Sequence, residues 1–240
     1  MNFLDYSEEV NYPIYLQLCT QPATNEMIRN VINTHHSYVN YVSSPTRNLR
    51  WLIYQTDNNE LLGAIGLSSC VLAIKCRDDY IGWDKSARLK NSNKVANNSR
   101  FCLIPNATEM KNVGSMALKL LRTDGAREWK KRYGDDLIGI ETYIEPINND
   151  ELYRAGTVYL ADNWTYVGRS QGNSIKKAPL KLWRAEDSSR GRLARSNPAA
   201  ACEKYGYNKE GYVIKESKPK MVFFKPLIKK WKTELLNYDD

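Results

Sequence analysis

The stretch that decides the fold is residues 99–144, SRFCLIPNATEMKNVGSMALKLLRTDGAREWKKRYGDDLIGIETYI. It opens with a short apolar run closed by a proline, which predicts a strand. Apolar residues then recur at helical spacing from about Ser115 to Tyr133, and Gly134 follows as a C-cap, so a long and partly buried helix is expected. Residues 137–144 predict the next strand. Strand, helix and strand in this order are typical of an α/β fold.

The chain on either side supplies further elements of both kinds. Residues 78–98, between the predicted hairpin and the strand at 99–105, are polar and contain one compact cluster, Ile81-Gly82-Trp83-Asp84. We therefore expect a single α/β (α+β) domain over residues 1–240, with a mixed central sheet, a core at about 25–172 and a basic part at 173–240. The other predicted elements are a helix at 25–41, a strand hairpin at 50–55 and 61–67, a short helix at 153–161, a strand at 164–168, a helix or loose insertion at 184–200, a strand at 221–224 and a basic helix at 228–236.

Positive charge is concentrated in the last third of the chain. Residues 171–240 hold 16 Lys and Arg against 8 Asp and Glu, a net charge of +8, whereas residues 1–170 hold 19 of each sign. Lys and Arg side chains release counterions from a nucleic-acid backbone, so a polyphosphate is the expected partner. The alternative is a solvated basic surface that binds nothing.

The compartment follows from what the sequence lacks. No apolar run approaches the ~20 residues that span a bilayer, and the first residues have neither the basic nor the apolar part of a signal peptide. The five cysteines are scattered and form no C-x-x-C pair, so we expect reduced thiols and neither a zinc site nor a disulfide framework. These features predict a cytoplasmic protein without a membrane partner or a metal.

The run Val113-Gly114-Ser115 lies at the predicted start of the long helix. A helix N-terminus presents unpaired N–H groups and a positive dipole end, which can receive a phosphate or pyrophosphate. In acyltransferases that use a cofactor, the coenzyme A pyrophosphate lies at this place. The alternative is an ordinary helix start with Ser115 as its N-cap.

Three further groups are candidates for chemistry or binding. Glu141, on the strand after the helix, could act as a general base or orient an amine, or could simply be paired or solvated. His35 and His36 are adjacent on a helix and point about 100° apart, so they cannot both face one site. The aromatic run that contains Trp164 predicts core packing first and stacking on bases second.

Several motifs, in order, resemble the DruA protein family of Druantia anti-phage systems. The resemblance runs from about His36 to Gly172 and implies involvement with nucleic acid. The matching motifs are Arg77-Asp78-Asp79-Tyr80-Ile81-Gly82-Trp83, Asn97-Asn98-Ser99-Arg100-Phe101-Cys102-Leu103-Ile104-Pro105, Gly114-Ser115, Trp129 with Tyr133-Gly134, Glu141-Thr142-Tyr143-Ile144, Tyr153-Arg154-Ala155 and Asn163-Trp164-Thr165-Tyr166-Val167-Gly168.

The second half also resembles the Mom-type DNA modification proteins of bacteriophages, which share a GNAT-like acyltransferase fold. This resemblance implies a GNAT-like core here, with a basic C-terminal extension, and a transfer to the amine of adenine. The donor it implies is acetyl-CoA or an aminoacyl carrier. By motif and spacing, the residues implicated in that reaction fall on His36, Tyr54, Ser115 and Glu141.

Three functions remain open from the sequence. The first is a Mom-type transferase that modifies DNA, expected to be double-stranded, and the second is a non-catalytic DNA-binding component of a phage or anti-phage system. The third is an N-acetyltransferase for small molecules or proteins. The residues expected to contact nucleic acid are Arg100, Arg154, Trp164, Arg169, Lys176 and Lys177. Oligomeric state is left undetermined by the sequence.

Overall fold

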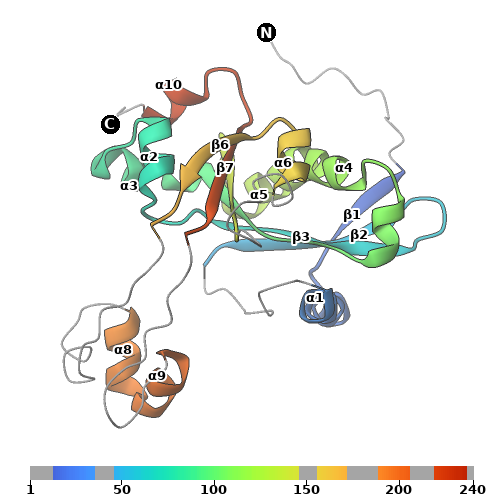
Figure 1. The fold of residues 1–240 in the computed structure, drawn as a ribbon, viewed down its shortest axis with the longest axis horizontal. Coiled ribbons are helices and arrows are strands. Elements are labelled where there is room, and N and C mark those ends of the chain that lie inside the picture. Colours follow the sequence, from blue (N-terminus) through green and yellow to red (C-terminus); the bar gives the residue numbers. More distant parts are fainter. Residues whose placement is uncertain (1–12, 36–45, 146–155, 172–188, 206–218, 237–240) are drawn as a thin grey trace. The chain divides into compact units, whose positions relative to one another are not determined.

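The structure is a computed structural model that describes residues 13–35, 46–145, 156–171, 189–205 and 219–236 (Figure 1). The chain divides into two compact units where the sequence predicted a single domain. The first unit is Met1–Arg169 together with Met221–Asp240, and the second is Ser170–Lys220. The second unit is therefore an insertion between two segments of the first, and the basic part of the chain is not one continuous extension.

The first unit is built on a seven-stranded sheet, in which only β4 and β5 run parallel and the other neighbours are antiparallel. A parallel pair requires a long crossover, and the predicted helix of residues 115–133 provides it. The mixed α/β prediction is thereby confirmed. In sheet order the strands are β1 (Ile14–Leu18), β2 (Asn48–Gln55), β3 (Leu61–Ser69), β4 (Val95–Leu103), β5 (Gly139–Ile144), β7 (Met221–Pro226) and β6 (Thr165–Arg169).

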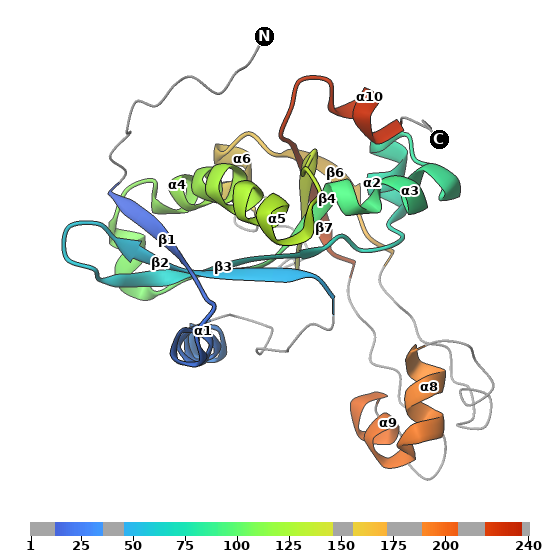
Figure 2. The same ribbon diagram turned by 180° about the vertical axis from the view of Figure 1, so that it is seen from behind.

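Helices cover both faces of this sheet. The crossover helix runs as α4 (Val113–Leu120), a π-helical turn (Leu121–Gly125) and α5 (Ala126–Tyr133), and it ends at Gly134, whose φ of 82° fits the predicted C-cap. Figures 1 and 2 show α4, α5 and α6 on one side of β2 and β3, with α1 on the other. The remaining helices of this unit are α1 (Pro22–His35), α2 (Lys75–Ile81), α3 (Lys85–Asn91), α6 (Thr157–Ala161) and α10 (Trp231–Leu236).

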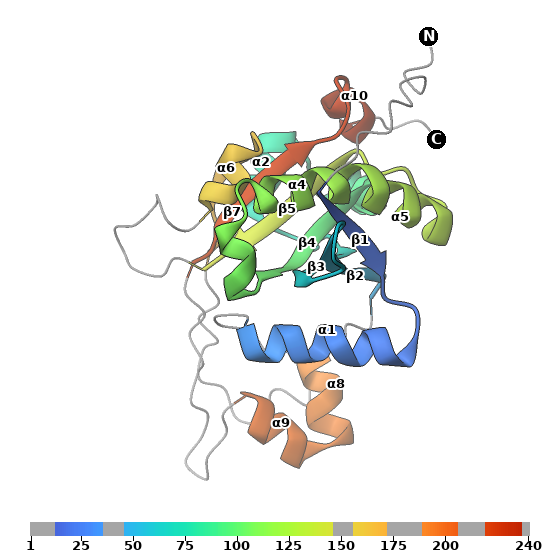
Figure 3. The ribbon, with the colours of Figure 1, turned by 90° about the vertical axis from the view of Figure 1, so that its right-hand side faces the viewer.

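Side chains alternate between the two faces along each strand, and this alternation divides the core. Ile140 and Phe223 pack into the cluster under α4, α5 and α6, together with the fully buried Trp51 and Trp129. Phe224, the next residue on β7, packs into a second cluster that contains residues of α2, α3 and α10. A third cluster joins α1 to β2, β3 and β4, and Figure 3 shows α1 lying across these strands.

Two differences from the predicted elements have a clear physical reason. The strand expected at 99–105 begins at Val95, because the Asn98 side chain donates to the backbone oxygens of Gly66 and Arg100, both at 3.0 Å, where the β3–β4 ladder shifts register. Asn98, which lies in the stretch expected to be a polar connection, therefore provides hydrogen bonds to backbone oxygens at a β-bulge. Ser115 is not the N-cap, because the helix starts at Val113 and Asn112 precedes it with a φ of 62°.

The strand β1 and the helices α2 and α3 were not predicted; α2 is short, and its buried residues include the charged Arg77 and Asp78. The second unit contains α8 (Ser189–Ser196), within the helix or loose insertion expected at 184–200, and α9 (Pro198–Tyr205), which extends beyond it. The Asn197 side chain accepts the Ala200 N–H at 3.0 Å, which caps the start of α9.

Candidate functional site

The two parallel strands pair over a short length and then part. Their register covers three pairs, from Val95 with Gly139 to Asn97 with Glu141, although β4 and β5 both continue further. Beyond that point Tyr159 of α6 donates to the Asn98 Oδ1 at 2.8 Å, and the Thr142 hydroxyl donates to the Asn98 backbone oxygen at 3.0 Å. On this face, the buried side chains of the protein itself bridge the strands where they separate.

The start of α4 does not fit an open pyrophosphate site. Val113 is 4% exposed and Gly114 is buried. A Cβ at Gly114 would lie 2.5 Å from the Val158 Cγ2 of α6, so the missing side chain leaves room for a neighbouring helix and not for a ligand. Ser115 is half-buried within the first turn. The three residues expected to hold an acyl-CoA donor are thus explained by helix packing, and no step is assigned to such a donor.

Glu141 lies on the opposite face, at the centre of a buried ion-pair network. The carboxylate accepts a hydrogen bond from Arg77 Nη1 at 2.5 Å and another from the Val71 N–H at 2.8 Å. Both charged side chains are fully buried. Arg77 also donates to Asp78 Oδ1 at 2.7 Å, and Asp78 receives Arg88 at 2.8 Å. Two positive and two negative side chains therefore balance within one cluster.

The electrostatics of this network favour a structural role. Burial raises the pKa of the Glu141 carboxyl, while Arg77 and the Val71 N–H oppose that rise. Burial and then the Glu141 charge raise the pKa of the Tyr143 phenol, so this group stays protonated at neutral pH. The Trp83 ring lies 5.0 Å from the Arg77 guanidinium and closes the other side. The paired alternative for Glu141 is the one observed.

The expected catalytic residues do not converge. Glu141 aligns through Asn97 and Ser68 with Asn48, whereas Tyr54 lies six residues further along β2. Strand spacings put the two about 14 Å apart across the sheet and about 20 Å apart along it.

The other two residues do not complete a site either. Ser115 belongs to the helix on the other face, and His36 is outside the described residues. Burial, and then the neighbouring Tyr15, raise the pKa of Tyr54, whose ring stacks on that of Tyr15 at 5.5 Å.

Of the residues expected to contact nucleic acid, three are described. Trp164 is 3% exposed, packs edge-on against Tyr159 and donates its indole N–H to Asp162 at 2.8 Å, so its ring is closed to a base, and that prediction is corrected by its burial. Arg169 is exposed at the end of β6. Arg100 is half-buried on β4. Arg154, Lys176 and Lys177 lie outside the described residues.

Arg77 is the important residue that sequence reasoning missed. It belongs to a motif quoted above, but its role depends on Glu141, 64 residues away. A signal was present in the run Arg77-Asp78-Asp79, where opposite charges flank an apolar cluster. In the part of the chain that the structure describes, no His, Cys, Asp and Glu side chains gather into a group that could hold a metal ion. None of the described helices is long and apolar enough to cross a membrane.

The first unit thus defines a class of mixed α/β protein in which one parallel strand pair, joined by a helix and stabilised by a buried ion-pair network, is embedded in an antiparallel sheet. The family model described as Druantia protein DruA matches residues 4–177. The chain belongs to this family, as the motifs predicted.

Two solved structures are similar to the chain at low sequence identity. One is a protein assigned as an acetyltransferase, from Sphaerobacter thermophilus DSM 20745, with a TM-score of 0.37 and 11% identity over 89% of this chain and 93% of that one. The other is the aminoglycoside 6′-N-acetyltransferase from Enterococcus faecium, with a TM-score of 0.38 and 13% identity over 90% and 97% of the two chains. No curated protein matches the chain.

Proposed function

We propose that this chain is a DNA-binding component of a Druantia-type anti-phage system, and that its inserted unit supplies most of the contact to duplex DNA. Membership of the DruA family supports the defence context. One observation carries the DNA-binding part. Residues 170–220 hold 12 Lys and Arg against 5 Asp and Glu, a net charge of +7, whereas the rest of the chain holds 23 against 22, a net charge of +1.

This charge coincides with a structural unit. The insertion is compact by itself, and the sheet-bearing unit that carries it is nearly neutral. Such a concentration of like charge disfavours a compact state through self-repulsion, which a polyanion relieves. Release of counterions from the DNA backbone then drives binding without base contacts.

Exposed cations on the two described helices of the insertion are suited to phosphate contacts. Arg192 and Arg195 are exposed on α8, three residues apart and therefore on neighbouring positions of one helix face. Lys204 is exposed near the end of α9. Arg169, at the boundary of the insertion, is also exposed.

A Mom-type transfer to adenine needs a group that can take a proton from the attacking amine. Glu141 is fully buried and its carboxylate is held by Arg77 and Val71, so it supports the fold better than it supports this step. Binding without chemistry is therefore the function that we infer. Nucleoside mass spectrometry on DNA from cells expressing the protein should find no new nucleoside, and an adenine-derived product would overturn this inference.

The DNA-binding proposal is tested by the salt dependence of affinity for a duplex. Neutralising three insertion cations, as Arg192→Gln/Arg195→Gln/Lys204→Gln, should weaken binding. It should also make the slope of log K against log salt less steep. The magnitude of the slope should fall by about 1 for each phosphate that is no longer neutralised, a total decrease of about 3. Fluorescence anisotropy with a labelled duplex at several salt concentrations measures both quantities.

The matched control neutralises three exposed lysines of the nearly neutral unit, Lys85→Gln/Lys111→Gln/Lys131→Gln. It removes the same charge and should keep most of the slope. Equal effects in both triple variants would reduce the result to net charge and refute the assignment to the insertion. A wild-type protein that shows no saturable DNA binding at low salt would refute the proposal as a whole.

A further inference from the structure

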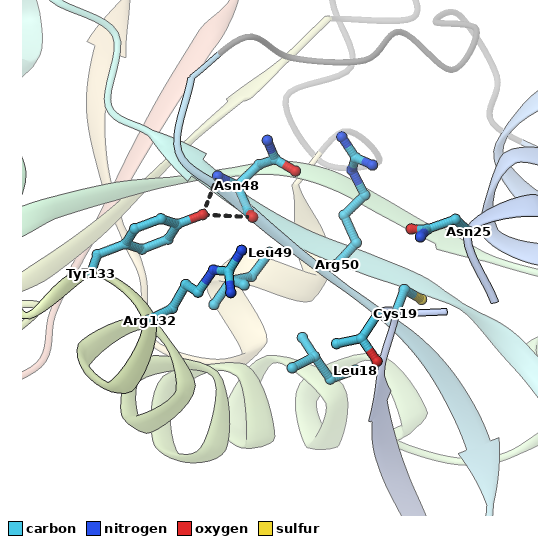
Figure 4. A pocket seen from close by; sticks show the side chains of 9 residues that line it. Leu18, Cys19, Asn25, Asn48, Leu49, Arg50, Arg132 and Tyr133 are labelled. Carbon is cyan, nitrogen blue, oxygen red and sulfur yellow. Dashed lines mark hydrogen bonds between the residues drawn. The ribbon is translucent and has the colours of Figure 1, made fainter. Parts of the chain in front are cut away.

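A cavity of about 420 Å³ opens at the edge of the sheet, away from the network around Glu141 (Figure 4). It exists because β1 is shorter than its neighbour. The β1–β2 ladder reaches only from Gln55 to Trp51, and Cys19 donates its N–H to the Arg50 oxygen at 2.8 Å before the chain turns away into α1. Within the described residues, the first residues of β2 therefore have no strand beside them on that edge.

The walls of the cavity come from three elements brought together by the fold. The end of α5 contributes Arg132 and Tyr133, the start of β2 contributes Asn48 and Arg50, and the first turn of α1 contributes Asn25. Tyr133 fixes the α5 end against β2, since its hydroxyl donates to the Asn48 oxygen at 2.8 Å and accepts the Asn48 N–H at 2.9 Å. The site is thus held by strand and helix contacts.

The lining has a one-sided charge. Among the described residues, nine line the cavity, two of them arginines, and none is Asp or Glu. The neighbouring carboxylate of Asp135 is engaged by Arg47. Arg132 makes no ion pair within the described parts of the chain. Two guanidinium groups that line one cavity, without a carboxylate among its described lining residues, favour an anion there by Coulomb attraction.

The polar groups match a phosphate and the volume matches a nucleotide. Arginine presents several N–H donors in a planar fork that suits phosphate oxygens. The side-chain amide of Asn25 adds a donor and an acceptor that suit a sugar or a base, whereas the Asn48 amide already donates to the Thr46 backbone oxygen at 2.8 Å. A space of about 420 Å³ is in the range of sites for small ligands.

We propose that this cavity binds a small phosphorylated ligand of nucleotide size, whose negative charge is attracted by the two arginines that line it, Arg132 from the α5 side of β2 and Arg50 from the α1 side. The same chemistry is offered by a free nucleotide and by the 5′-phosphate end of a nucleic-acid strand. The site is distinct from the inserted unit, so this inference does not rest on the proposed DNA binding.

Isothermal titration of the whole chain with ATP, AMP and inorganic phosphate tests the proposal, alongside short single strands with a 5′-phosphate or a 5′-hydroxyl. We expect saturable binding to a phosphorylated ligand, weakened at least about tenfold by Arg132→Gln and by Arg50→Gln. Arg132 is exposed at the end of α5, so its replacement leaves the fold intact. Tight binding only to the 5′-phosphorylated strand would identify the strand end as the source, and tight binding to AMP or ATP would identify a nucleotide.

The matched control is Arg127→Gln, an exposed arginine on the same helix that is paired with Asp124 and does not line the cavity. It should keep full affinity. The triple variant of the insertion should also keep it, which separates this site from DNA binding. No saturable binding by the wild type to any of these ligands, or equal affinity of wild type, Arg50→Gln and Arg132→Gln, would overturn the proposal.

Discussion

Breaking the buried pair of Arg77 and Glu141 should strongly destabilise the first unit. Both side chains are 0% exposed and their closest atoms are 2.5 Å apart, so removing one partner leaves a charge without its counter-charge in the core. Such changes cost about 3–5 kcal/mol. The two single variants should lose different amounts of stability, because the charged residue that remains in each variant keeps different hydrogen-bond partners.

Glu141→Gln leaves Arg77 with Asp78, which still accepts from its Nε at 2.7 Å. We expect a cost near the lower limit, about 3 kcal/mol. Arg77→Met removes the cation that is closest to Glu141, whose carboxylate still accepts the Val71 N–H, and we expect about 5 kcal/mol. In the double variant Asp78 and Arg88 still balance each other, so the destabilisation should fall short of the sum of the two single values by about 2–3 kcal/mol.

Urea denaturation followed by tryptophan fluorescence measures these differences. Five of the six tryptophans belong to the first unit, so the signal reports mainly on the unit that contains the pair. A destabilisation of about 3 kcal/mol lowers the midpoint by about 1 M when the slope is about 3 kcal/mol per M. Additive effects in the double variant, or effects below about 1 kcal/mol in both single variants, would refute the network.

The stability of the Glu141→Gln variant also has to be known before its activity is interpreted. A Glu141→Gln protein that has lost function has first to be shown to be folded, because the structure predicts a lower stability for that variant independent of any chemistry.

Three further predictions follow from close contacts and burial. Gly114→Ala should cost about 1–3 kcal/mol in thermal or urea unfolding, because its Cβ would lie 2.5 Å from Val158, and adding Val158→Ala should recover part of that stability. Tyr159→Phe should cost about 1–3 kcal/mol, because it leaves the Asn98 Oδ1 without its donor; a neutral result would contradict that hydrogen bond. Burial raises the pKa of Cys19 to about 11 from 9.0, so peptide mapping should show iodoacetamide labelling of Cys19 at pH 8 about 100-fold slower than for an unperturbed thiol. Because the folded pKa is the higher one, this thiol also makes folded stability fall as pH rises from about 9 to about 11, and fast labelling at pH 8 would contradict the burial.

The regular elements of the first unit were largely predictable where a pattern is local. The apolar spacing of residues 115–133 predicted the crossover helix, and Gly134 predicted its end, because both depend on neighbours within a few turns. β1 was missed because Ile14–Leu18 is short and has no turn signal of its own. β4 began earlier than predicted because Asn97 and Asn98 are poor strand formers, and their place in the sheet depends on partners in β3 and β5.

The sequence pointed to individual residues of the candidate site, but it did not predict how they are arranged in space. The motifs identified the DruA family, and Glu141 lies on the strand after the crossover helix, as predicted, where the paired alternative is observed. Which face it occupies follows from strand alternation, but what it meets there depends on α2, whose Arg77 is 64 residues away. The same holds for Gly114. Its close neighbour Val158 belongs to a different helix, so the contact could not be predicted from the sequence around Gly114.

The sequence by itself determined the class of fold, the family and the excess of positive charge, because these are properties of local pattern and composition. Only the tertiary structure decided that most of that charge belongs to a separate unit, that Glu141 is paired and that Arg50, Arg132 and Asn25 line one cavity. The physical reason is that ion pairing, burial and cavities depend on contacts between residues far apart in the chain. Such contacts cannot be predicted from local sequence patterns.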